Sequence, residues 1–333
     1  MLDALAPDDL AWSTAGHLAA EFRAGRLTAL DVVEATLVRI RARDPLLNSF
    51  TTVTEQRARD RARALDEAHA SGKPLGPLAG APFAVKNLFD ISGVPTIAGS
   101  KINREKEPAR RDAALIERLE HAGAVLVGAL NMGEYAYDFT DENVHDGPAH
   151  NPHDPKRMTG GSSSGSAAAV AGGLVPFALG SDTNGSIRVP SSLCGVFGLK
   201  PTYGRLSRAR TFPFSASFDH VGPIARSVRD LAITYDAMQG YDADDPVCAE
   251  RSTEPVTPVL ERSLDGLRVA VAGGYFKCRA AEPVYAIDRI AAALGANRDI
   301  EIPEAERAAF AARSGSPGRV IAATPAAGGQ ERT

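Results

Sequence analysis

The stretch that decides the predicted fold is GGSSSGSAAAVAGGLVPFALGSDTNGSIRVP, residues 160–190. Its glycine- and serine-rich start indicates a loop that opens a helix, and the small residues of that helix permit close approach to another backbone. The apolar run VPFALGSD predicts a strand, and TNGSIRVP predicts a tight turn directly after it. The segment therefore presents serines on two loops, one before the helix and one after the strand.

The chain before this stretch begins with a predicted helical region, residues 14–70, that includes a helix over 54–70. Thr28 followed by Asp31 has the spacing of a capping box, and the apolar residues after it recur at helical intervals. We therefore expect helices to open the fold.

Helices and strands alternate further along the chain. PLAGAPFAVK predicts a turn and a short strand that ends at Lys86, residues 113–122 predict a helix, and residues 124–130 predict a strand. A helix over 227–239 and a strand over 267–271 are predicted on either side of a proline- and aspartate-rich connection. This alternation favours an α/β sheet covered by helices.

The composition is that of an ordinary globular chain, with 333 residues, 44% apolar and 23% charged. A net charge of −4 and a pI near 6.0 give no sign of binding to nucleic acid or to a membrane surface. Neither a signal peptide nor a transmembrane run is recognisable. Three widely spaced cysteines argue against a disulfide framework and favour a reducing, cytoplasmic location: Cys194, Cys248 and Cys278.

Three segments carry residues suited to nucleophilic catalysis: AVKNLFD with Lys86, GGSSSGS with residues 162–164, and GSDTNGSIRVP with Ser186. A serine needs help to react at neutral pH, and a lysine whose amine is kept neutral by burial can supply it. The glycine-rich turn before Ser186 would leave backbone N–H groups free to form an oxyanion hole. Alone, each segment is more commonly a surface charge, a flexible loop or a turn, and only their combination favours catalysis.

In this order, the three segments resemble the amidase signature family. The flanking stretches PLAGAPFAVKNLFDISGVPTIAGSK, ERLEHAGAVLVGALNMGEYAY and DHVGPIARSVRDLA resemble it too, so that the similarity extends over residues 15–295. The resemblance implies an α/β fold of the amidase-signature type, with a central twisted mixed β-sheet covered by helices on both faces.

The resemblance also implies a role for each residue. Ser186 matches the nucleophile, Ser162 the bridging serine that follows a cis peptide bond, and Lys86 the general base. The backbone N–H groups that match the oxyanion hole are those of Thr183, Asn184, Gly185 and Ser186. Residues expected to support the loops are Ser163, Asp182 and Arg188; for the last two a buried ion pair is the plainer alternative. Neutral Lys86 would draw a proton from Ser162, and Ser162 from Ser186, without metal or organic cofactor.

The activity that the resemblance implies is hydrolysis of a small amide or urea-type C–N bond, other than a peptide bond, through an acyl-enzyme. AGSKIN, NPHDP and YDAMQG are most similar to the branch that hydrolyses 1-carboxybiuret in cyanuric acid degradation. One alternative is a glutaminase of the kind found in glutamyl-tRNA(Gln) amidotransferase. Another is an inactive, truncated amidase that only binds partners. The expected partners are a small amide substrate, further copies of the chain and a small accessory subunit, with neither nucleic acid nor membrane.

Two features depart from the family pattern. Ser164 stands where the family has a glycine, so a backbone with positive φ there would be strained. Family members also continue well beyond this chain, so residues 1–298 are expected to be an incomplete amidase domain of low stability and activity. The atypical end, residues 299–333, is expected to be poorly ordered and to result from a frameshift or misassembly.

Two other site chemistries compete with the amidase interpretation. GGSSSGS also fits G-x-S-x-G with Ser163 at its centre, but the Asp219 and His220 of the resulting triad would be adjacent, which is rare. A metal site is the second, and its candidate ligands lie on a loop without the spacing of helical metal ligands: His145, His150 and His153. A phosphate loop is excluded because no Gly-Lys-Ser/Thr follows the glycines.

Overall fold

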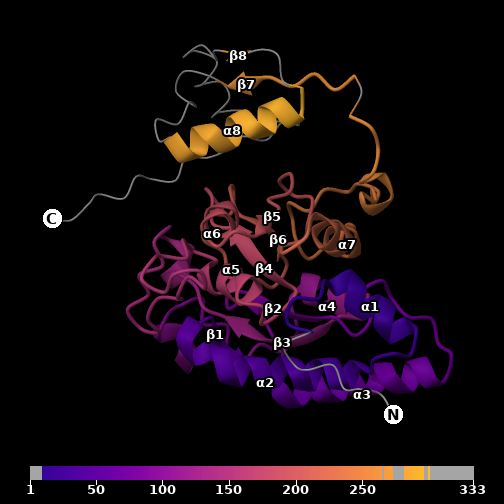
Figure 1. The fold of residues 1–333 in the computed structure, drawn as a ribbon. Coiled ribbons are helices and arrows are strands. Elements are labelled where there is room, and N and C mark those ends of the chain that lie inside the picture. The colour runs from indigo at the N-terminus through magenta and orange to yellow at the C-terminus, as the bar shows by residue number, and fades with distance from the viewer. Residues whose placement is uncertain (1–9, 265, 273–280, 296–298, 301–333) are drawn as a thin grey trace. The chain divides into compact units, whose positions relative to one another are not determined.

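The computed structural model describes residues 10–264, 266–272, 281–295 and 299–300. It divides into two compact units, Met1–Leu260 and Glu261–Thr333. The first unit is built on a six-stranded sheet with the order β1-β3-β2-β4-β6-β5 (Figure 1). The strands are β1 (Phe50–Val53), β2 (Pro82–Lys86), β3 (Val125–Leu130), β4 (Phe177–Asp182), β5 (Phe197–Gly198) and β6 (His220–Ala225). Strands β3, β2 and β4 are parallel and the other pairings are antiparallel, so the sheet is mixed as predicted.

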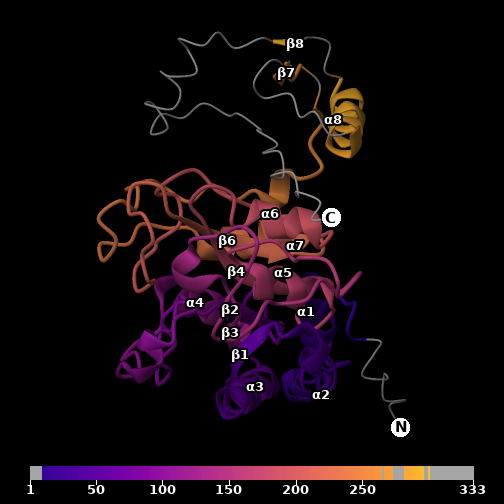
Figure 2. The same ribbon diagram turned by 90° about the vertical axis from the view of Figure 1, so that its left-hand side faces the viewer.

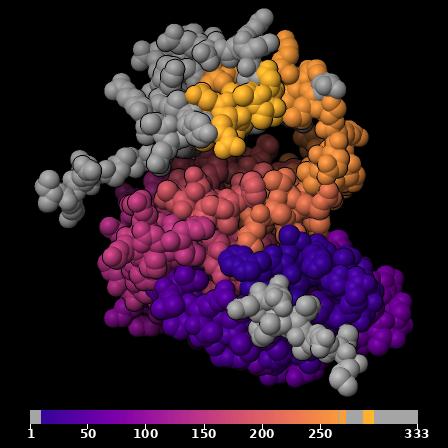
Figure 3. Space-filling view, in the orientation of Figure 1, coloured from indigo at the N-terminus to yellow at the C-terminus, as the bar shows by residue number. Residues whose placement is uncertain are grey.

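Helices cover both faces of this sheet, which confirms the predicted architecture (Figures 1 and 2). Side chains alternate between the faces of a strand. Phe83 and Val85 of β2 join an apolar cluster with α4 and α7, whereas Ala84 joins a cluster with α2, α3 and α5. The helices of this unit are α1 (Ala15–Arg23), α2 (Ala29–Leu47), α3 (Glu55–Ala70), α4 (Ala114–His121), α5 (Ser164–Ala171), α6 (Arg188–Leu193) and α7 (Val228–Met238). Helices α2 and α3 form the indigo and purple surface at the bottom of Figure 3.

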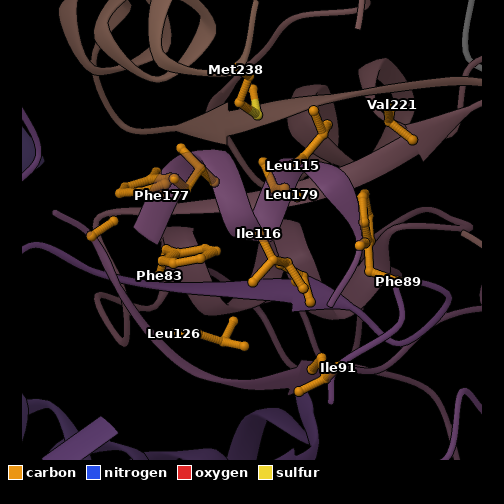
Figure 4. Packing of buried hydrophobic residues seen from close by; sticks show 14 of the residues in the cluster. Phe83, Phe89, Ile91, Leu115, Ile116, Leu126, Phe177, Leu179, Val221 and Met238 are labelled. Carbon is orange, nitrogen blue, oxygen red and sulfur yellow. The ribbon is translucent and has the colours of Figure 1, made fainter. Parts of the chain in front are cut away.

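The core between the sheet and α4 fixes the central strands in place (Figure 4). The rings of Phe83 in β2 and Phe177 in β4 stack with centroids 5.5 Å apart and planes 2° apart. Ile116 of α4 and Leu126 of β3 are fully buried in the same cluster. Strands buried on both faces are expected to be apolar along their length, as PFAVK and VLVGAL are. Lys86, at the end of β2, is therefore held by a rigid scaffold.

The structure corrects several expected elements. Within the predicted helical region, residues 50–53 form strand β1, since an aromatic and three β-branched residues suit a strand that pairs with β3. The predicted cap is present, because the Thr28 side chain accepts a hydrogen bond from the Asp31 N–H at 3.0 Å. The segment predicted as a turn becomes helix α6 from Arg188 onward. Strands β5 and β6 were not predicted.

The second unit contains β7 (Val271–Ala272), α8 (Ala281–Ala293) and β8 (Asp299–Ile300), with β7 and β8 parallel. The strand predicted over 267–271 is thus present only from Val271. Residues 301–333 lie outside the described residues, so the expected disorder of the tail and the boundary at residue 298 stay predictions. Within the described part of the chain, no helix is long and apolar enough to cross a membrane.

Candidate active site

The candidate catalytic residues meet at one edge of the sheet. Parallel strands have their carboxyl ends at the same edge, where ligand sites of α/β proteins form. Strand β2 ends at Lys86, β3 is followed by Asn131, and β4 ends at Asp182. Helix α5 begins beside them, because the N–H of Gly165 donates to the carbonyl of Asn131 at 3.1 Å. The topology thus brings three parts of the chain together. They are Lys86, the serine loop (residues 160–164) and the turn that carries Ser186 (residues 183–187), called the nucleophile turn below.

Lys86 is fully buried and its amine faces two hydroxyl groups. The Nζ atom donates to Ser162 Oγ at 2.7 Å and to Ser181 Oγ at 2.9 Å. Burial lowers the pKa of Lys86 to about 7, against the opposing effect of nearby carboxylates such as Asp141. At neutral pH a large fraction of this amine is therefore uncharged, as a general base requires.

The serine loop is tied to the end of β4. The Gly161–Ser162 peptide bond is cis, as the resemblance implied. The Ser163 hydroxyl donates to the Ser181 carbonyl at 3.1 Å and accepts from the Ser181 N–H at 3.2 Å. The Ser163 N–H donates to the carbonyl of Ser186 at 3.3 Å. Ser163 therefore supports both loops through the backbone, and its hydroxyl is already engaged.

The triad of the competing hydrolase interpretation is not assembled. The Asp219 carboxylate accepts from the Thr183 hydroxyl at 2.6 Å, and His220 Nδ1 lies 3.1 Å from the carbonyl of Asp182. Both residues therefore support the nucleophile turn, and neither is hydrogen-bonded to Ser163 in the described part of the chain.

The turn that carries Ser186 is organised by a fully buried carboxylate, Asp182. Its oxygens accept from the N–H groups of Gly185 at 2.8 Å and Ile187 at 3.2 Å. They also accept from Arg188 Nε at 2.9 Å and Nη2 at 3.0 Å. Burial acts to raise the pKa of Asp182, but the bonds and charge of Arg188 outweigh it and the pKa lies below its usual range. The pair joins a fully buried carboxylate to a guanidinium whose side chain is 30% exposed, and it also shapes the loop.

The expected oxyanion hole loses one donor, because the Gly185 N–H is used by Asp182. Among the described residues, no hydrogen bond is recorded for the N–H groups of Thr183, Asn184 and Ser186, which leaves them available. Ser186 is 4% exposed. Its hydroxyl forms no recorded hydrogen bond with Ser162 in the described structure, so the direct proton link between these two serines stays a prediction.

Asp182→Asn is expected to destabilise the protein, because it removes the buried negative charge that pairs with the Arg188 guanidinium. Breaking a fully buried pair on one side costs about 3–5 kcal/mol in the free energy of unfolding. Because the Arg188 side chain is 30% exposed, a loss at the lower end of this range is expected, and urea denaturation would measure it. Asp154→Asn is the control, because its pair with Arg157 is solvent-exposed at 3.4 Å and should change stability by less than about 1 kcal/mol. Equal losses in the two variants would contradict the structural role of Asp182.

At the start of α5, Ser164 departs from the family pattern without the backbone strain that was considered for it. Ser164 is the first residue of α5 and is not among the residues with positive φ, so the expected strain is absent. Its neighbour Gly165 is required, since a Cβ there would lie 2.5 Å from the Ser49 carbonyl oxygen and 2.6 Å from the Asn131 nitrogen. The predicted close approach of this helix to another backbone is therefore confirmed.

The three loop histidines do not converge. His145 Nε2 lies 3.1 Å from a Glu134 carboxylate oxygen, and His153 Nε2 lies 3.0 Å from the carbonyl of Cys194. Within the residues that the structure describes, no group of three or more His, Cys, Asp or Glu side chains is placed to hold a metal ion.

Comparison with known sequences decides the family. A family model described as Amidase matches residues 31–310, which is most of the chain. This chain belongs to the amidase family. It is 57% identical over 283 residues to AtzE, the 1-carboxybiuret hydrolase subunit of Pseudomonas sp. (strain ADP), covering 85% of this chain and 62% of that protein. It is 46% identical over 257 residues to the glutamyl-tRNA(Gln) amidotransferase A subunit of Chloroflexus aurantiacus, covering 77% of this chain and 53% of that protein.

Two solved structures with sequences similar to this chain share its fold. One, from work on an unexpected vestigial protein complex that reveals the evolutionary origins of an s-triazine catabolic enzyme, superposes with a TM-score of 0.87 at 54% identity. The superposition covers 90% of this chain and 66% of the chain in that structure. The native peptide amidase of Stenotrophomonas maltophilia gives a TM-score of 0.83 at 32% identity, over 91% of this chain and 64% of its own. The amidase resemblance and the predicted fold class are therefore confirmed, for a chain that spans less than two thirds of the length of the relatives it matches in sequence.

Proposed function

We propose that the chain is an amidohydrolase that cleaves a small amide or urea-type C–N bond, of the kind found in 1-carboxybiuret. The observation that carries the proposal is the buried Lys86 amine, 2.7 Å from the Ser162 hydroxyl, on a loop that is bonded to Ser186. The 57% identity to a 1-carboxybiuret hydrolase subunit supports this choice of substrate.

In the proposed reaction, protons move along three side chains, from Ser186 through Ser162 to Lys86. Neutral Lys86 takes the Ser162 proton while Ser162 takes the proton of Ser186, whose oxygen bonds to the substrate carbon. The free N–H groups of the nucleophile turn stabilise the developing oxyanion. The proton then returns through Ser162 to the leaving nitrogen as the C–N bond breaks. Water enters by the same proton path and hydrolyses the ester on Ser186.

The test is a comparison of ammonia release from 1-carboxybiuret and from glutamine. Faster turnover of 1-carboxybiuret is expected. Preferred turnover of glutamine would support the second candidate, a glutaminase, which the 46% identity to an amidotransferase component favours. If a fluorophosphonate failed to label Ser186, the chain would be a binding subunit without the proposed chemistry.

The rate of hydrolysis is expected to rise with pH through a midpoint near 7. The cause is that Lys86, whose burial lowers its pKa to about 7, must lose its proton before it can act as a base. Activity should fall about tenfold for each pH unit below the midpoint, as a single ionisation requires. A rate independent of pH between 5 and 9 would contradict the role of Lys86.

A small accessory subunit is also proposed, because a structure 54% identical to this chain is described as a protein complex. Co-expression and size-exclusion chromatography would test it, and a homo-oligomer is the alternative outcome.

We further propose a cytoplasmic location, in keeping with Cys194 and Cys248, which are both buried free thiols.

A further inference from the structure

A cavity of about 180 Å³ lies beside the proposed base. It is lined by Ser181, whose hydroxyl is 2.9 Å from Lys86 Nζ, and by His220, the first residue of β6. Strands β4 and β6 pair with Asp182 opposite His220, so the histidine stands beside the residue that precedes the nucleophile turn. The cavity is smaller than a pocket for a drug-sized ligand, and it therefore suits a small group.

Hydrogen bonds fix the position of the proton on the His220 ring. Its Nδ1 lies 3.1 Å from the carbonyl oxygen of Asp182 and 2.6 Å from that of Phe218. Carbonyl oxygens only accept hydrogen bonds, so Nδ1 must carry the hydrogen and donate it. The pKa of His220 lies below its usual value, because burial and then the charge of Lys200 disfavour the imidazolium ion. In the neutral ring Nε2 is therefore an acceptor with a free lone pair.

The acceptor nitrogen of His220 is open to a ligand and its ring is held in place. Among the described residues, Nε2 forms no recorded hydrogen bond, and it is not one of the buried atoms that lack a partner, so solvent reaches it. The ring meets the Tyr203 ring edge-on, with centroids 5.5 Å apart. The Tyr203 hydroxyl in turn donates to the carbonyl of Ala216 at 2.7 Å. Nε2 is thus a pre-oriented acceptor, which lowers the entropy lost on binding.

The charged side chains that line the cavity are bonded to other groups of the protein. The Asp219 carboxylate accepts from a hydroxyl of the nucleophile turn at 2.6 Å. Arg208 Nη1 donates to the carbonyl of Asp219 at 3.1 Å, and the Asp245 carboxylate accepts from the Arg208 N–H at 2.8 Å. Arg210 pairs with Asp244 at 2.8 Å. The cavity therefore suits an uncharged part of a ligand, and the acceptor of the imidazole ring is the polar group that it offers.

We propose that this cavity binds the acyl side of a urea-type substrate, and that His220 Nε2 accepts a hydrogen bond from an N–H group there. The inference rests on the proposed function, because it names the residue that selects the substrate of the proposed site. A urea-type carbonyl carries nitrogen on both sides, whereas the side-chain amide of glutamine has carbon on its acyl side. A substrate without that N–H covers the acceptor and leaves it unpaired, which is costly. His220 is thus a specificity-determining residue.

Two substitutions of His220 separate recognition of the substrate from support of the fold. His220→Asn keeps an N–H donor near the position of Nδ1, for the two backbone carbonyls, and has no atom at the position of Nε2. His220→Gln places its amide near the position of Nε2 and offers an oxygen there. The kcat/KM for 1-carboxybiuret should fall about 10- to 100-fold in His220→Asn, as for one lost hydrogen bond, and His220→Gln should recover most of this loss. A histidine that only supports the backbone would give the opposite order.

Labelling of Ser186 in the full chain is the second measurement, with a fluorophosphonate that has alkyl substituents and no N–H group. In this reaction the serine oxygen bonds to phosphorus, fluoride leaves, and the serine proton passes through Ser162 to Lys86. The labelling rate in His220→Asn should fall far less than kcat/KM, because the reagent makes no use of the acceptor. His150→Asn is the matched control, since His150 is also half-buried but does not line the cavity, and both rates should be unchanged.

Full turnover of 1-carboxybiuret by His220→Asn, or equal losses of turnover and labelling, would overturn the inference and leave the proposed function standing. Turnover of glutamine alone would overturn both, because the cavity would then serve an acyl group attached through carbon. Absent labelling of the unmodified chain would overturn the proposed chemistry, and NMR of the ¹⁵Nε2 resonance of His220 then decides the inference. A shift of this resonance on addition of biuret, which carries N–H groups on both sides of each carbonyl, would support it, and an unchanged resonance would refute it.

Discussion

Ser186→Ala is expected to abolish both amide hydrolysis and fluorophosphonate labelling. Removal of a covalent nucleophile lowers kcat by at least about four orders of magnitude, because no other group can form the acyl-enzyme. Ser186 is the serine whose turn presents the free N–H groups of Thr183 and Asn184, which would stabilise the oxyanion formed by its attack. The measurement is kcat under saturating substrate, with mass spectrometry to locate the label.

Ser163→Ala is the matched control in the adjacent loop. The Ser163 hydroxyl is bonded to the N–H and carbonyl of Ser181, so its removal costs support for the loop and leaves the nucleophile in place. A loss of about a hundredfold or less is expected, equivalent to the roughly 1–3 kcal/mol of a buried hydrogen bond. Equal losses in the two variants, or normal turnover by Ser186→Ala, would refute the assignment of Ser186.

The sequence was sufficient for the central part of the fold. Strands β2, β3 and β4 were predictable because strands buried on both faces are continuous apolar runs, and PFAVK ends in a lysine that marks the edge of the sheet. Strand β1 was missed, because its four residues lie between two long helices and their β-propensity is a weak local signal. Strand β5 has two residues and depends on pairing with β6, which no local pattern encodes.

The site was predictable only where motifs resemble a family. The contact between Lys86 and Ser162 joins residues 76 positions apart, and spacing alone gives no such pairing. Ser181 had no signal in the sequence, because its importance arises from its contact with the buried amine of Lys86. The use of the Gly185 N–H by Asp182 was equally hidden, since the resemblance treats all four N–H groups of the turn alike.

Burial of Lys86 has a cost in stability that the proposed function explains. The unfolded chain holds this lysine as an ammonium ion with its usual pKa of 10.5, whereas in the folded protein burial lowers the pKa to about 7. Between these two values the unfolded state binds more protons, so the free energy of unfolding rises with pH. Below pH 7 both states are protonated and the whole penalty remains. Since one pKa unit is equivalent to about 1.4 kcal/mol, the penalty there amounts to several kcal/mol.

Lys86→Met is therefore expected to lose activity and to gain stability. Methionine has a similar length and no amine, so it removes the general base, and kcat should fall by at least about 10²–10⁴-fold, the usual contribution of such a group. The free energy of unfolding should increase, and it should increase more at pH 6 than at pH 9, because the burial penalty of the charged amine is largest below pH 7. Urea denaturation at both pH values would measure the gain in stability. The variant also loses the hydrogen bonds from Lys86 to Ser162 and Ser181, which lowers the gain by the same amount at both pH values. An inactive variant with the same change in stability at both pH values would mean that Lys86 keeps an ordinary pKa in the folded protein. In that case it would act as a charged hydrogen-bond donor and the proton path from Ser186 would need another base.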